Sequence, residues 1–159
     1  MNIDILCVGK IKEKYLNDAL NEYSKRISRY AKLNFIEVAD EKTVDKQSAA
    51  LDDKVKLSEA YRLSKYLKED AYIISLEIEG KMLDSVELAE RIKKSGVDGY
   101  STIQFIIGGS LGLHDCITKS ADLHLSFSKM TFPHQLMRVI LTEQIYRAFR
   151  IINNEPYHK

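Results

Sequence analysis

The densest group of chemically useful side chains lies in the stretch SFSKMTFPHQLMR, residues 126–138. It places hydroxyls, two aromatic rings, a methionine, a lysine and a histidine in one turn between a predicted strand and a predicted helix. Such a turn leaves backbone N–H and C=O groups free to bind a ligand. Phe127, Met130 and Phe132 could enclose a flat ring, or each could simply close the end of the hydrophobic core.

A second candidate is the glycine turn IIGGSLGL, which contains Gly108, Gly109 and Gly112. Glycines adopt backbone conformations closed to other residues and let a ligand lie against the main chain. The turn is not a P-loop, because no Gly-Lys-Ser/Thr follows it. It is not a dinucleotide fingerprint either, because the first predicted strand is followed only by Gly9. Taken alone, it is equally well read as a tight strand-to-helix turn.

Two of the four histidines stand out by position. His134 opens the last predicted helix, and His158 lies beyond its end, whereas His114 and His124 are isolated and are interpreted as structural. A twenty-residue helix is about 30 Å long. His134 and His158 can therefore meet in one chain only if the tail doubles back. Antiparallel packing of two last helices across a two-fold axis would instead bring each tail to the partner's His134.

The elements that must position these groups follow from hydrophobic periodicity. Strands are predicted at 3–8, 34–38, 71–80, 101–109 and 122–128. Helices are predicted at 13–30, 48–67, 84–96, 113–121 and 133–153. Ser48 and Asp84 are the expected N-caps and Gly96 an expected helix stop. We expect Leu51, Val55, Leu63 and Leu67 to face inward, and residues 39–48 to include a mobile loop. The alternation predicts one α/β domain over residues 1–159, with a mostly parallel sheet.

In an open α/β sheet, ligands bind at the carboxyl ends of the strands. The third, fourth and fifth predicted strands end in SLEIEG, IIGGSLGLHD and SFSKMTFPH. These three segments are therefore the candidate site. No histidine pair and no Cys/His cluster has metal-ligand spacing, so we expect no metal.

The composition and charge of the chain indicate which kinds of partner it can bind. The chain has 159 residues, 45% hydrophobic, with a formal net charge of +1. Basic regions at 10–32 and 129–159 flank an acidic one at 37–59, and they are either solvated helix faces or a phosphate-facing surface. On the last helix, Arg138, Arg147 and Arg150 could pair with Glu143 or grip phosphate. We expect Cys7 and Cys116 to be buried, reduced thiols of a cytoplasmic protein. No signal peptide and no membrane-spanning run of roughly 20 apolar residues is found.

The segments IIGGSLGL and LSFSKMTFPHQLMRVILTEQIYRAFRI and the terminal PYHK together resemble the RlmH family. The likeness extends over the whole chain, including ILCVGKIKEKY and LEIEGKMLDS. These proteins are SPOUT-class methyltransferases that act on 23S ribosomal RNA. The resemblance implies an α/β fold with a C-terminal trefoil knot, a homodimer, and S-adenosylmethionine held in the knot. It also implies methylation of N3 of a pseudouridine in a stem-loop of 23S rRNA within assembled ribosomes.

The resemblance also assigns residues. The implied cofactor contacts are Leu76, Gly108, Phe127, Ser128, Lys129, Met130, Thr131 and Phe132. Four further positions match family positions linked to substrate binding or catalysis: His134, Arg147, Tyr157 and His158. Our hypothesis is that Arg147 binds an RNA phosphate, and no motif position departs from the family pattern in a way that changes these assignments.

Methyl transfer to N3 requires removal of the proton that this nitrogen carries at neutral pH, so a general base would help. His158 is the first choice because histidine accepts protons near pH 7. Tyr157 could orient the base or stack on the ring, and His134 could place the substrate. A non-catalytic nucleotide- or ribosome-binding α/β module is the alternative, and it would not need His158. An NAD-dependent enzyme is disfavoured because the first-strand fingerprint is missing.

Overall fold

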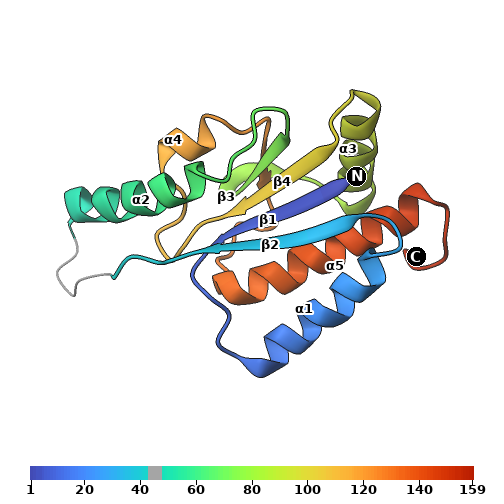
Figure 1. Ribbon diagram of the computed structural model, residues 1–159, viewed down its shortest axis with the longest axis horizontal. Helices are drawn as coiled ribbons and strands as arrows, with labels where there is room; N and C mark the ends of the chain where they lie inside the picture. Colours follow the sequence, from blue (N-terminus) through green and yellow to red (C-terminus); the bar gives the residue numbers. More distant parts are fainter. Residues whose placement is uncertain (43–47) are drawn as a thin grey trace.

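The computed structural model describes residues 1–42 and 48–159. Within them, five parallel strands form one sheet in the order β2-β1-β4-β3-β5. The strands are β1 (Asn2–Val8), β2 (Lys32–Val38), β3 (Tyr72–Met82), β4 (Thr102–Ile107) and β5 (Leu123–Ser126). The helices are α1 (Lys14–Ile27), α2 (Ala49–Ser64), α3 (Ser85–Val97), α4 (Asp115–Thr118) and α5 (His134–Ile152) (Figure 1). The predicted α/β fold with a parallel sheet is confirmed, while residues 43–47 of the predicted mobile loop lie outside the described residues.

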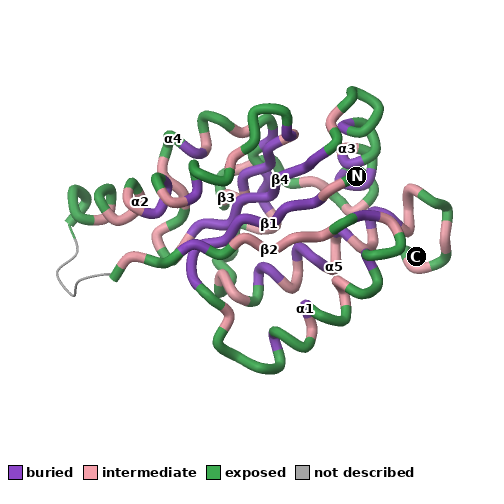
Figure 2. Tube along the Cα trace, viewed as in Figure 1, coloured by how far each residue is buried: buried purple, intermediate pink, exposed green. Residues whose placement is uncertain are grey.

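Helices cover both faces of the sheet (Figure 1). One core cluster joins β1, β3, β4 and β5 to α1, α3 and α5; its members include Ile3, Ile5, Ile92, Phe105, Leu141 and Ile145. The other joins the opposite face to α2 and α4; its members include Leu6, Val8, Leu63, Ile106 and Ile117. Burial concentrates on β1 and β4 at the centre of the sheet (Figure 2). No helix in the described ranges is long and apolar enough to cross a membrane.

Local sequence signals set the bounds of α3. The side chain of Asp84 accepts from the Glu87 N–H at 2.8 Å, and the Glu87 carboxylate accepts from the Asp84 N–H at 2.8 Å. This capping box confirms Asp84 as the N-cap. The expected stop at Gly96 is wrong, because Gly96 lies inside the helix. Gly99, at φ 98°, ends it instead, with Tyr100 N–H donating to Ser95 O at 3.0 Å in a Schellman motif.

Helix α2 begins as expected but presents a different face to the sheet. Ser48 Oγ accepts from Leu51 N–H at 3.3 Å, which confirms the N-cap. Leu51 is exposed, however, and the buried residues are Glu59, Ala60 and Leu63. The inward placement of Leu51 is therefore wrong: only the last two turns of this helix lie against the sheet. Of the two thiols, Cys7 is buried as expected, whereas Cys116 is exposed.

Strand β3 shapes the site because it does not stop at Gly80. It pairs with β5 up to Leu76, bulges outward, and resumes pairing at Lys81. Gly80 is required at the return, because a Cβ there would lie 2.8 Å from the backbone carbon of Leu125. Residues 77–80 consequently project from the carboxyl edge of the sheet.

One buried charge joins α5 to the sheet. The guanidinium of Arg138 is 1% exposed and donates to the Glu37 carboxylate at 2.7 Å. Its Nη2 also donates to the backbone oxygens of Val8 and Gly9, at 2.8 and 2.7 Å. The hypothesis that Arg138 grips phosphate is therefore wrong: its donors are used inside the protein.

Replacing Arg138 tests this anchor. We expect Arg138→Leu to lower the free energy of unfolding by roughly 3 kcal/mol, because it leaves Glu37 and two strand-end carbonyls without their donor. Urea denaturation followed by circular dichroism measures the change. Arg26→Leu is the matched control, because Arg26 is 43% exposed and forms its ion pair with Glu22 of its own helix; it should cost less than about 1 kcal/mol. Equal losses in the two variants would contradict the assignment.

Candidate functional site

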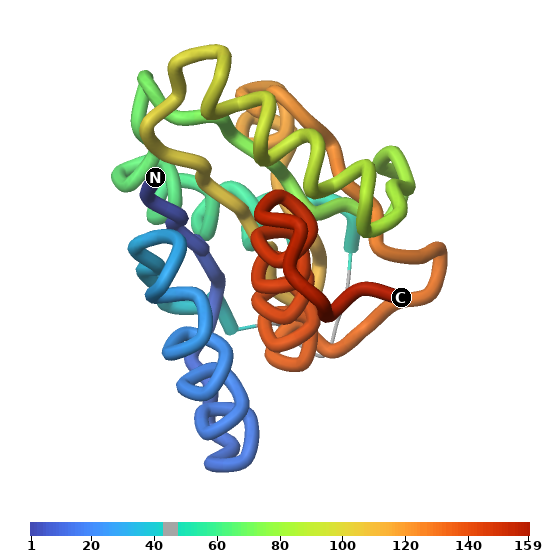
Figure 3. The backbone as a smooth tube through the Cα atoms, turned by 90° about the vertical axis from the view of Figure 1, so that its right-hand side faces the viewer, coloured from blue at the N-terminus to red at the C-terminus, as the bar shows by residue number. Residues whose placement is uncertain are grey.

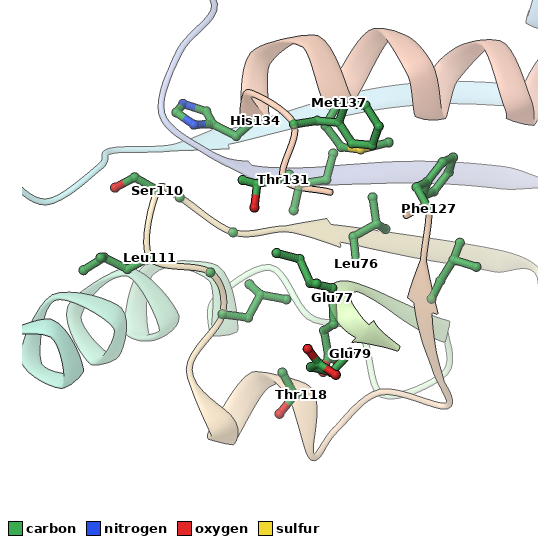
Figure 4. Close-up of a pocket in the computed structure, with 18 of the residues that line it drawn as sticks. Leu76, Glu77, Glu79, Ser110, Leu111, Thr118, Phe127, Thr131, His134 and Met137 are labelled. Carbon is green, nitrogen blue, oxygen red and sulfur yellow. The ribbon is translucent and has the colours of Figure 1, made fainter. Parts of the chain in front are cut away.

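A cavity of about 450 Å³ lies at the carboxyl edge of the sheet, where β3, β4 and β5 end (Figure 4). Its walls come from the β3 bulge, the glycine turn after β4, and the loop from β5 into α5. The structure thus brings together the three segments selected by the strand-end argument. Its volume is within the ~300–1,000 Å³ range of small-molecule sites.

Seven of the eight residues assigned to a cofactor line this cavity: Leu76, Gly108, Phe127, Ser128, Met130, Thr131 and Phe132. The eighth, Lys129, is exposed and does not line it. His134 lines the cavity as well, although its assigned role concerned the substrate. Sequence reasoning did not assign Glu77, Glu79 or Met137, which also contribute to the walls.

The glycine turn is shaped by close backbone contacts. A Cβ on Gly108 would lie 2.6 Å from the backbone carbon of Gly112, so no side chain fits there. Gly112 adopts φ 79°, and its N–H donates to Gly109 O at 3.1 Å. Only glycine combines these requirements at low cost. The turn therefore presents main chain at its glycines to the cavity, beside the side chains of Ser110 and Leu111.

The loop after β5 is held to the β3 bulge. The Ser126 hydroxyl donates to the Ile78 backbone oxygen, 2.8 Å away, and the Ser128 hydroxyl accepts from the Met130 N–H at 3.0 Å. Phe127 is half-buried, whereas Met130 is 73% exposed. Phe127 therefore belongs to the cavity wall, and Met130 stands at its solvent side.

The cavity is lined by both polar and apolar side chains. Figure 4 shows Glu77, Glu79 and Thr118 toward one end, and Ser110 and His134 toward the other. The apolar side chains of Leu76, Phe127 and Met137 also line the cavity, with Phe127 on the side away from Ser110 in Figure 4. One oxygen of Glu77 is bonded to His124 Nδ1 at 2.6 Å. The arrangement suits a ligand with a flat apolar part, hydroxyl donors and positive charge.

His134 is held in a partly buried position at the start of α5. Burial, helped by the nearby Arg138 cation and opposed by Asp40, lowers the pKa of His134 below its ordinary value. A lowered pKa keeps the imidazole neutral at pH 7. Neutral His134 can accept a hydrogen bond or a proton at the cavity.

The C-terminal tail doubles back along its own α5. Tyr157 O–H donates to the Glu143 carboxylate at 3.0 Å, and the Arg147 guanidinium lies 4.7 Å from the Tyr157 ring centroid. The ring also meets Tyr146 edge-on at 4.9 Å. His158 Nδ1 lies 3.5 Å from Arg147 Nη1. Three of the assigned residues are therefore neighbours, and Glu143 joins them.

Glu143 is the shared hydrogen-bond partner of Tyr157 and Arg147. Burial and the Glu143 carboxylate raise the pKa of Tyr157 to about 12, so its hydroxyl keeps its proton well above neutral pH. Arg147 donates twice to the same carboxylate, at 2.7 and 3.1 Å. Glu143 and Arg147 are four residues apart on one helix, so this ion pair could be predicted from the sequence. The hydrogen bond from Tyr157 could be found only in three dimensions.

The tail stands next to the first cavity but not in it. His158 lines a second cavity of about 400 Å³, together with Ile140 and Gln144 of α5. The two cavities share Leu125 and Phe127. Within one chain, His134 and His158 thus face different cavities that share part of one wall.

The other histidines have local partners. His114 caps α4 by accepting from Cys116 N–H at 3.1 Å, and His124 bonds Glu77. Among the described residues, no group of His, Cys, Asp and Glu could hold a metal ion.

A family model described as "Predicted SPOUT methyltransferase" matches residues 1–158. Proteins of Bifidobacterium animalis subsp. lactis and Bifidobacterium adolescentis, both named ribosomal RNA large subunit methyltransferase H, are each 58% identical over 159 residues and the full length of both chains. A relative from Methanococcus maripaludis is 63% identical over the same length and coverage. A solved structure from Haemophilus influenzae, described as "a probable methylase family protein", shares the fold. Its TM-score is 0.55 at 17% identity, over 99% of this chain and 70% of that one.

Gly108→Ala tests the glycine turn. The new Cβ must displace the Gly112 backbone, so we expect a loss of about 1–3 kcal/mol in the free energy of unfolding, as in other overpacked sites. Ser110→Ala in the same turn is the control, because Ser110 is exposed; it should change stability by less than about 0.5 kcal/mol. Thermal denaturation of both proteins measures the difference, and matching melting temperatures would show that the turn is not as tight as described.

Proposed function

The chain belongs to the SPOUT methyltransferase family, and we propose that it transfers a methyl group from S-adenosylmethionine to N3 of a pseudouridine in 23S ribosomal RNA. The family match covers nearly the whole chain, and full-length relatives carry the name of a large-subunit rRNA methyltransferase. These names favour the catalytic function over a module that only binds nucleotides or ribosomes.

The observation that carries the proposal is the single cavity formed by the β3 bulge, the glycine turn and the β5–α5 loop. The residues present fit the donor. Bare main chain at Gly108 allows close approach of a ligand, and Leu76 and Phe127 supply apolar surface for a flat ring. Glu77 and Glu79 supply hydrogen-bond acceptors and negative charge. When bound, S-adenosylmethionine supplies an electrophilic methyl group on a positively charged sulfur.

The chain's own residues supply positioning and proton transfer, since much of the acceleration in such reactions is positioning. His158 takes the N3 proton as general base, and Tyr157, protonated at neutral pH, orients His158 or stacks on the acceptor ring. His134, kept neutral by burial and by Arg138, places the substrate at the edge of the donor cavity. Arg147 contacts an RNA phosphate with the donor that faces His158, while Glu143 holds its other side.

We further propose that two copies of this single-domain chain form a homodimer in which one copy's tail completes the other copy's site. Apolar side chains stand exposed beside the donor cavity: Met130 is 73%, Leu136 39% and Phe132 37% exposed. A partner helix packed there would cover them. The C-terminal segment would pass through a loop of the chain to form a trefoil knot, and the knot would hold the donor, as the resemblance to the RlmH family implies.

The acceptor is best recognised in an assembled ribosome of the cytoplasm. A net charge of +1 gives weak attraction to naked RNA. Several modest contacts over a large particle can replace one strongly basic surface. Binding should then weaken as salt rises, because phosphate contacts release counterions.

Deleting Tyr157–Lys159 separates transfer from donor binding. We expect the truncated protein to lose methyl transfer to unmodified large-subunit ribosomes while its donor affinity stays within about threefold. The tail lies outside the donor cavity, and general acid–base groups typically contribute about 10²–10⁴-fold. Mass spectrometry of the rRNA and isothermal titration with S-adenosylmethionine supply the two measurements. A control that lacks only Lys159 should keep its activity, and undiminished transfer by the full truncation would refute the role of the tail.

Ligand-dependent thermal shifts test the cofactor. At a hundredfold excess over its dissociation constant, S-adenosylmethionine should stabilise the folded chain by about 2.7 kcal/mol. NAD and ATP at the same concentration should give no comparable shift. A shift with NAD alone would instead support the dehydrogenase alternative.

A further inference from the structure

The tail reverses direction immediately after α5. Asn154 adopts φ 53°, in the left-handed region, and Glu155 N–H donates to Arg150 O at 2.9 Å. Figure 1 shows the chain leaving the end of α5 and turning back, and Figure 3 shows that α1 lies beside α5. Chain ends are normally poorly ordered unless something ties them down.

Three side chains tie this end down. The Glu155 carboxylate accepts from Arg150 Nη1 and from the Tyr30 hydroxyl. Arg150 Nη2 donates to Pro156 O at 2.8 Å, so one guanidinium holds two consecutive residues of the tail. We call Tyr30, Arg150 and Glu155 the clasp.

The clasp is itself fixed to the core. The Tyr30 ring stacks on Phe149, with centroids 5.6 Å apart and planes at 3°. Phe149 is buried, and the Arg150 side chain is only 15% exposed. Charge-assisted bonds in such a partly buried setting are stronger and more directional than a surface ion pair.

The first aromatic residue of the tail follows the clasp at once. Tyr157 comes two residues after Glu155, and its contacts with Glu143 and Arg147 lie one to two helical turns back from Arg150. The direction in which the chain leaves the clasp therefore determines where Tyr157 and His158 lie. The same dependence applies whether Tyr157 and His158 act in the site of their own chain or in that of a partner. In either case, the direction of the chain after α5 must be fixed.

We propose that Glu155 is a positioning residue for methyl transfer, which acts by closing the clasp with Arg150 and Tyr30 and so fixes Tyr157 and His158. The inference rests on the proposed function of the tail. Glu155 does not touch the donor cavity. Its loss should therefore lower turnover and leave donor binding unchanged.

Glu155→Gln is the main test, because it keeps size and removes the charge that attracts Arg150. We expect kcat to fall on the order of 10- to 100-fold, as for misplaced catalytic groups. The dissociation constant for S-adenosylmethionine should stay unchanged, and the protein should stay folded at the assay temperature, with a smaller loss of stability than in Arg138→Leu. Hydrogen exchange should show faster exchange of the Tyr157 and His158 amides. Glu90→Gln on α3 is the matched control, because Glu90 is exposed and distant from the tail in sequence.

Tyr30→Phe gives a second, milder variant, because it removes the hydroxyl and keeps the ring that stacks on Phe149. It should lower kcat by a smaller factor than Glu155→Gln does. The effects of the two substitutions should be non-additive, because both act on one contact.

Unchanged kcat in Glu155→Gln, or a loss of activity matched by a loss of donor affinity, would overturn the inference. If the truncation lacking Tyr157–Lys159 retains transfer, the proposed function of the tail fails. If only the truncation is inactive and Glu155→Gln is normal, the clasp alone is refuted.

Discussion

The guanidinium of Arg138 joins the beginning of α5 to the ends of β1 and β2, and the geometry of the site depends on it. It satisfies two backbone carbonyls and the Glu37 carboxylate at the edge of the sheet where ordinary strand pairing stops. Burying this cation is costly unless its partners are well placed, so the contact admits little freedom in the placement of α5. His134 lies one turn before Arg138 on the same helix, and the same cation helps to keep its imidazole neutral. Burial is the main cause of the lowered pKa of His134, and Arg138 contributes both to that pKa and to the position of the helix that carries it.

The rest of the site is built largely from backbone. The glycine turn closes on itself so tightly that no side chain fits at Gly108, and the β3 bulge returns under Leu125 only because residue 80 is glycine. Ser126 then fastens the β5–α5 loop to the bulge. The path of the backbone therefore determines the shape of the cavity. Its side chains, chiefly Glu77 and Phe127, add negative charge and apolar surface to the walls. The C-terminal tail differs from the cavity because side chains hold it in place. Glu143 accepts from Tyr157, and Arg150 donates to Glu155 and Pro156.

Local patterns were sufficient for much of this architecture. Alternating strand and helix periodicity predicted the parallel α/β sheet, and Asp84 was the predicted N-cap, which the structure confirms. The rule that ligands bind at strand ends selected the three segments that line the cavity. Contacts between distant residues were not predictable in this way. Nothing in the order of residues shows that Tyr30 meets Glu155, or that Arg138 points inward while Arg147 faces the tail. The wrong predictions for Gly96 and Leu51 have physical reasons. The end of α3 depends on which glycine adopts a positive φ, and the buried face of α2 depends on which of its turns contact the sheet.

The different environments of the two thiols give the molecule a built-in attachment point for a probe. Cys7 lies in the core, where burial raises the pKa of its thiol to about 12, so it presents almost no thiolate to an alkylating reagent. Cys116 is exposed on α4, between Asp115 and Thr118, and both of these neighbours line the cavity at the carboxyl edge of the sheet. A maleimide dye will therefore label the native chain at one position without mutagenesis. Its emission can report in real time on the filling and emptying of the adjoining pocket.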